Sequence, residues 1–76
     1  MIDVVMKFPS PSSATEAGKW LRFFTSGRYE QPTAFELVFK ATRVFTLQLL
    51  LDNIARHIPP IDWERTEILI KGEEEL

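Results

Sequence analysis

Hydrophobic and polar positions alternate at the beginning of the chain. Over residues 2–8 one side of an extended chain is apolar, made of Ile2, Val4, Met6 and Phe8. Because successive side chains of a strand point to opposite faces, this alternation predicts a half-buried β-strand over residues 2–8. Pro9 and Pro11 have no main-chain N–H to donate, so we expect the strand to end there.

The next segment has the spacing of a helix. Ser13 and Glu16 stand three residues apart, as in a capping box at a helix N-terminus. Apolar side chains then recur every three or four residues, at Ala17, Trp20, Leu21 and Phe24. Gly27 stands where many helices end in a left-handed residue. We therefore predict a first helix over residues 14–26.

A second, longer helix is predicted over residues 34–57. Thr33 and Glu36 repeat the capping-box spacing, and neither proline nor glycine interrupts the chain before Pro59 and Pro60.

Residues 66–71 are rich in β-branched side chains and precede Gly72, which predicts a closing strand. The alternative is a terminal helix capped by Asp62. The order β-α-α-β predicts an α+β fold, in which a long helical hairpin packs on a small antiparallel sheet. Such a sheet could be completed by dimerisation, since its edges can pair with another chain. We expect a single domain over residues 1–72 and an acidic, frayed tail over residues 73–76.

The second predicted helix is apolar on two different sides. In its first half Val38, Ala41 and Phe45 lie opposite a polar stripe, and near Thr46 the apolar side changes. No proline or glycine explains a kink, so we expect a straight helix that points its second apolar set outward. The alternative is a bend near Thr46, which would turn both halves into one core. The outward set comprises Leu47, Leu50, Leu51, Ile54 and Ile58.

An exposed aliphatic strip of this size is typical of an interaction surface. The leading prediction is a small non-enzymatic protein–protein interaction module, such as an accessory subunit, an adaptor or a small inhibitor. It would bind another protein or itself, most simply as a twofold dimer. Trp63 is predicted as an outlying anchor. The alternative is that the strip is ordinary core, covered by the first helix or by the segment that holds Ile61 and Trp63.

Composition and charge limit the other functions. The 76 residues allow one domain, the absence of cysteine excludes a disulfide, and the net charge of −2 argues against a general binder of phosphate backbones. A dimeric nucleic-acid-binding regulator stays as the alternative function. It would use a basic face of the helical hairpin formed by Lys19, Arg22, Arg28, Lys40 and Arg43.

Candidate chemistry is sparse. His57 could act as a general base with Asp52, Glu64 or Glu67 as its orienting carboxylate, but no nucleophile stands beside it, and a capping role at the helix end is the simpler interpretation. One histidine without thiolates makes a metal site unexpected, and no glycine-rich loop suggests a cofactor. No small-molecule substrate is evident.

The apolar run over residues 44–51 is too short to span a membrane, and the first residues do not resemble a signal peptide. We therefore expect a cytoplasmic protein without a membrane partner. No motif is specific enough to indicate a family.

Overall fold

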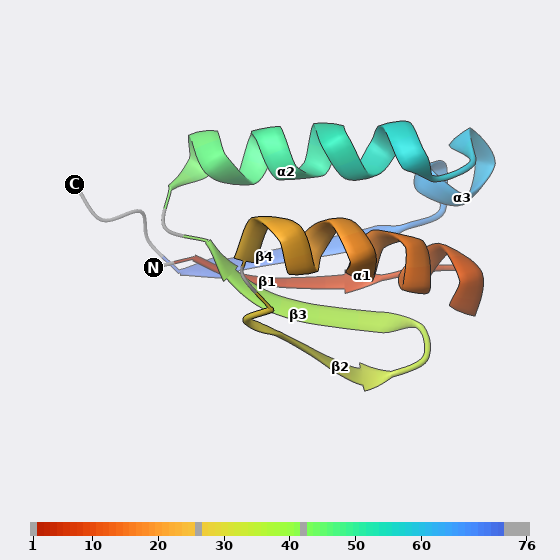
Figure 1. Ribbon diagram of the computed structural model, residues 1–76, viewed down its shortest axis with the longest axis horizontal. Coiled ribbons are helices and arrows are strands. Elements are labelled where there is room, and N and C mark those ends of the chain that lie inside the picture. Colours follow the sequence, from red (N-terminus) through yellow and green to blue (C-terminus); the bar gives the residue numbers. More distant parts are fainter. Residues whose placement is uncertain (1, 26, 42, 73–76) are drawn as a thin grey trace.

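Two helices lie side by side on one face of a four-stranded sheet (Figure 1). The computed structural model describes residues 2–25, 27–41 and 43–72. In chain order the elements are β1 (Ile2–Lys7), α1 (Pro11–Thr25), β2 (Tyr29–Thr33), β3 (Glu36–Ala41), α2 (Val44–His57), α3 (Pro60–Glu64) and β4 (Glu67–Gly72). The predicted α+β class with an antiparallel sheet is confirmed.

The sheet has the strand order β2-β3-β1-β4, and all neighbours in it are antiparallel. The chain contains two β-α-β units, β1-α1-β2 and β3-α2-β4. In each unit, one strand of the other unit lies between the two strands. This double split β-α-β arrangement is the ferredoxin-like topology. It supports many unrelated functions, so the fold alone assigns none.

The core lies between the sheet and the two long helices. Alternate residues of β1 and β3 point into it, as the period of a strand requires. The buried strand residues are Ile2, Val4 and Met6 of β1 and Leu37, Phe39 and Ala41 of β3. From the helices come Ala14, Ala17 and Leu21 of α1 and Leu47, Leu50 and Ile54 of α2.

The first strand forms as predicted, and its pairing extends beyond Lys7 because the N–H of Phe8 donates to the carbonyl of Phe35 (2.8 Å). Helix α1 begins three residues earlier than expected, at Pro11. The hydroxyl of Ser10, and not that of Ser13, accepts from an unpaired N–H of the first turn, the N–H of Ser13 (3.3 Å). Proline suits the first helical position, because an N–H there would have no partner within the helix.

The predicted helix over residues 34–57 is wrong in its first third. Residues 36–41 form β3, which makes a hairpin with β2. Thr33 and Glu36 stabilise the turn between β2 and β3. The N–H of Phe35 donates to the hydroxyl of Thr33 (3.2 Å), and that hydroxyl donates to the carboxylate of Glu36 (3.3 Å). Threonine bonds a nearby N–H in turns as readily as at helix starts, so the spacing did not distinguish the two.

Neither a straight helix nor a bent helix therefore explains why the apolar side changes near Thr46. Up to Ala41 the chain is a strand with a period of two, and from Val44 it is a helix with a period of 3.6. A helical projection drawn across both periods produces two apolar sides. The expectation of one straight helix is wrong.

The predicted closing strand forms as β4 over Glu67–Gly72, one residue later than predicted. The alternative of a terminal helix capped by Asp62 is wrong, because Asp62 lies inside the five-residue helix α3, whose N-cap is Pro59. The predicted tail over residues 73–76 lies outside the described residues. In the part of the chain that is described, no helix has the length and apolarity needed to cross a membrane.

Candidate protein-binding edge

The predicted aliphatic strip is part of the core. Leu47, Leu50, Ile54 and Ile58 are buried, while Leu51 and Trp63 are half-buried against the same core. The expectation that the strip points outward is wrong, because α2 turns this side toward the sheet and α1. The strip is the ordinary core that the sequence left as an alternative.

Other large apolar side chains are exposed. They come from α1, the β2–β3 turn, α2, α3 and β4, and are Phe23, Phe24, Phe35, Leu49, Ile61, Leu69 and Ile70. On α1, the rings of Phe23 and Phe24 contact each other edge to face. Only β4 contributes two such residues from a strand at the edge of the sheet. Sequence reasoning found the strand but missed this surface, because the order of strands in a sheet cannot be read from the apolar pattern.

Strand β4 is a long and regular edge. It pairs with β1 over six residue pairs from Glu67 to Gly72, without a shift in register. Its other side faces no strand among the described residues, so the main-chain groups on that side are available to another chain. Leu69 on one face of the sheet is 48% exposed and Ile70 on the other is 54% exposed. This edge therefore offers both a backbone ladder and apolar side chains.

The opposite edge, β2, is irregular. Its register against β3 shifts between Glu30 and Thr33, and Pro32 stands inside the shift. Proline has no N–H for a ladder, and an irregular register bends a strand away from a regular partner. A pairing chain is therefore expected at β4.

The face of the sheet away from the helices carries three ordered rows of side chains across β3, β1 and β4. The middle row is apolar and consists of Val38, Val5 and Leu69. The rows on either side alternate in charge: Lys40, Asp3 and Lys71 form one, and Glu36, Lys7 and Glu67 form the other. In the first row Lys40 Nζ lies 3.9 Å from Asp3 Oδ1. Opposite charges therefore face each other across every neighbouring pair of these strands.

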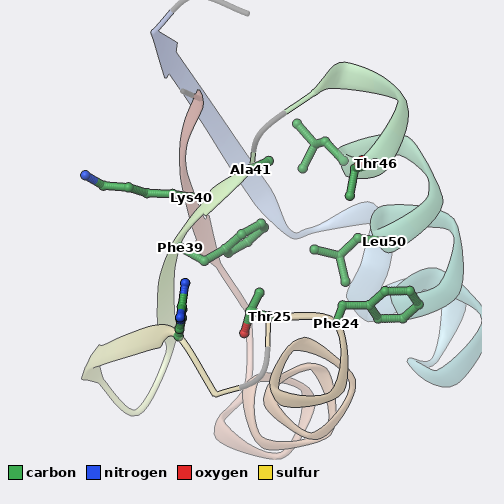
Figure 2. A pocket seen from close by; sticks show the side chains of 9 residues that line it. Phe24, Thr25, Phe39, Lys40, Ala41, Thr46 and Leu50 are labelled. Atoms are coloured by element: carbon green, nitrogen blue, oxygen red, sulfur yellow. The ribbon is translucent and has the colours of Figure 1, made fainter. Parts of the chain in front are cut away.

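A hollow lies between the ends of the helices and β3. It has a volume of about 490 Å³, and its apolar wall includes Phe24, Phe39, Ala41, Leu47 and Leu50. In Figure 2 Leu50 of α2 faces Phe39 of β3 across this hollow. Four of these five wall residues, all except Phe24, belong to the buried core, so the hollow is a shallow extension of the core toward solvent.

The five cations of the alternative function come from four different elements and connections. Lys19, whose ammonium lies 3.4 Å from the carboxylate of Glu16, belongs to α1. Lys40 belongs to β3 and points away from the helices (Figure 2). Because Lys40 lies on a strand, no helical hairpin carries the whole set, which also includes Arg22 of α1, Arg28 before β2 and Arg43 before α2. Binding of nucleic acid stays a prediction.

His57 packs against a tryptophan. Its ring centroid lies 3.9 Å from that of Trp20, and its Nδ1 donates to the main-chain carbonyl of Asn53 (2.8 Å). Through these contacts the imidazole of His57 caps the last turn of α2 and covers the indole of Trp20. Within the described ranges, no group of three histidine, aspartate or glutamate side chains is arranged to hold a metal ion.

Comparison of the chain with models of known families, with characterised proteins and with solved structures found no match.

Proposed function

We propose that this protein is a non-enzymatic interaction module that binds a partner chain by adding a strand to the open edge of β4. The observation that carries this proposal is the combination of features on β4: six regularly paired residues, an outer side without a neighbour among the described residues, and exposed Leu69 and Ile70. Sheet-edge addition is a common mode of recognition in proteins that bind extended segments.

The two kinds of contact have separate roles. Main-chain hydrogen bonds along β4 contribute affinity with little dependence on the partner's sequence. Side chains at alternate positions contribute selectivity, because they meet the partner on the two faces of the sheet. On the open face these are Glu67, Leu69 and Lys71, and on the helix face Ile68 and Ile70. A suitable partner segment is thus extended, apolar at alternate positions and of mixed charge.

An NMR titration with a short peptide tests the proposed mode. The probe is a capped synthetic peptide of sequence Glu-Ile-Leu-Ile-Lys-Gly, which is extended and has the required pattern. Added in excess to isotope-labelled protein at low-micromolar concentration, it should shift the amide resonances of residues 67–72 and leave those of β2 unchanged. The control peptide has proline in place of leucine, which removes a ladder N–H, and should bind at least about tenfold more weakly.

Two results would contradict the proposal. One is the absence of any shift in β4 at saturating peptide concentrations, measured where sedimentation shows the protein to be a single chain. The other is a set of shifts confined to the hollow beside Phe24 and Leu50, which would make that hollow the binding site.

A further inference from the structure

We infer that the partner chain at β4 is a second copy of the same protein, related by a twofold axis that passes beside Leu69. The inference rests on the proposed function, since it names the occupant of the same edge. Its basis is the sequence of residues 67–71, Glu-Ile-Leu-Ile-Lys, which is complementary to itself when the direction of the chain is reversed.

Antiparallel pairing of two copies about Leu69 satisfies every position. Leu69 lies opposite Leu69 of the second copy, and Ile68 lies opposite Ile70. Glu67 lies opposite Lys71 of the second copy, and the twofold axis repeats this ion pair. Residues directly opposite each other share a face of the sheet, so apolar meets apolar and acid meets base on the correct sides.

The charge rows of each sheet continue across this seam. One row ends at β4 in the order Glu36, Lys7, Glu67, and the other row ends there in the order Lys40, Asp3, Lys71. In the dimer, the first row of one copy meets the second row of the other. The joined row alternates in sign over all six side chains.

The apolar row continues in the same way. Val38, Val5 and Leu69 of one copy meet Leu69, Val5 and Val38 of the other, and the stripe then runs over the six central strands, ending at Glu30 of β2 on each side. Leu69 and Ile70, both about half exposed in the single chain, become covered at the seam. The product is a continuous eight-stranded antiparallel sheet with the helices of both copies on one side.

Other registers lack this complementarity. A shift of two residues places Leu69 opposite Lys71 or opposite Glu67, and a shift of one residue brings side chains of opposite faces together. Parallel pairing in register sets Glu67 against Glu67 and Lys71 against Lys71, which is repulsive. The charges on β4 therefore select one arrangement of a second copy.

Sedimentation of the full chain over a range of concentrations tests for the dimer. The wild type should reach twice the mass of the single chain. Leu69→Lys brings two ammonium groups together at the axis and should weaken the dimer at least about tenfold. The matched control is Leu49→Lys on α2, which makes the same change at a residue of similar exposure (51% against 48%) and should leave the dimer intact.

A charge exchange tests the register independently. Glu67→Lys alone and Lys71→Glu alone should each be monomeric, because each seam then contains two like-charged pairs. An equimolar mixture of the two variants should form a mixed dimer, because every pair in the mixed seam is again of opposite sign. Circular dichroism of each variant verifies that it is folded. A merely structural role of these residues would not produce rescue on mixing.

The possible outcomes separate the dimer from the proposed function. A wild type that stays monomeric at all concentrations, a Leu69→Lys variant that stays dimeric, or a mixture without rescue overturns the dimer at β4. If the peptide still shifts β4 in such a case, the edge binds another extended chain and the proposed function stands. If Leu69→Lys does not fold, the mixing experiment alone decides.

Discussion

Single residues in this chain act through the conformation that they permit. Gly27 has a φ of +83°, and its N–H donates to the carbonyl of Arg22 (3.0 Å), which closes the end of α1. The sequence predicted this left-handed position, and the structure confirms it. A Cβ at Gly27 would meet no atom within 4 Å. The cost of replacing this glycine is therefore the strained backbone conformation and not steric crowding.

We expect Gly27→Ala to lower the free energy of unfolding by about 1–2 kcal/mol, because alanine disfavours a positive φ. Gly27→Asn should lower it less, since asparagine tolerates this region better. Urea denaturation of the three proteins measures the difference. Equal stability of the alanine variant and the wild type would show that α1 does not end in this way.

A second residue-scale feature joins distant parts of the chain. Asp62 of α3 accepts hydrogen bonds from the hydroxyls of Ser13 and Ser10 at the start of α1, and Ser13 is buried. Ser13 thus holds α3 against α1 instead of capping its own helix.

We expect Ser13→Ala to cost about 1 kcal/mol of stability, because one hydrogen bond to a carboxylate acceptor is lost and Ser10 still binds Asp62. Ser12→Ala on the exposed side of the same turn is the control and should change stability by less than about 0.5 kcal/mol. Thermal unfolding followed by circular dichroism makes the comparison. A similar loss in both variants would contradict the role given to Ser13.

At the scale of elements, the sequence specified β1, α1 and β4 within a few residues but not the β2–β3 hairpin. The apolar periods of β1 and α1 are unmixed, and β4 is marked by its β-branched residues and by Gly72. In the hairpin, Pro32 and the irregular register shorten β2, and the spacing of Thr33 and Glu36 fits a helix start as well as a turn. Which strand lies at the edge depends on contacts between segments far apart in the chain. For this reason, the candidate binding edge could not be predicted from the sequence.

The burial of α2 gives a prediction for the strip that the sequence analysis placed outside. Ile54 has no exposed surface, so Ile54→Ala should lower the free energy of unfolding by about 2–5 kcal/mol. Leu49→Ala, on the outer side of the same helix, should change it by about 0.5 kcal/mol or less. Chemical denaturation distinguishes them. If Ile54→Ala were as stable as the wild type but no longer associated, the strip would have to be an interface, as the sequence analysis predicted.

At the scale of the whole molecule, a small domain without disulfides has a thin margin of stability. A dimer adds to that margin in a way that depends on concentration, because association stabilises only the folded chains. The melting temperature of the wild type should therefore rise with protein concentration, while that of Leu69→Lys should stay constant. Differential scanning calorimetry over a hundredfold range of concentration provides the check. A wild-type melting temperature independent of concentration would count against association.

The unequal edges of the sheet have a consequence for the size of the assembly. A sheet that can grow from both edges would polymerise, as amyloid does. In the proposed dimer β4 of each copy is used, and both outer edges are β2 strands with Pro32 and a shifted register. We therefore expect growth to stop at two chains, because the proline that makes β2 a poor strand also disfavours the addition of a third chain.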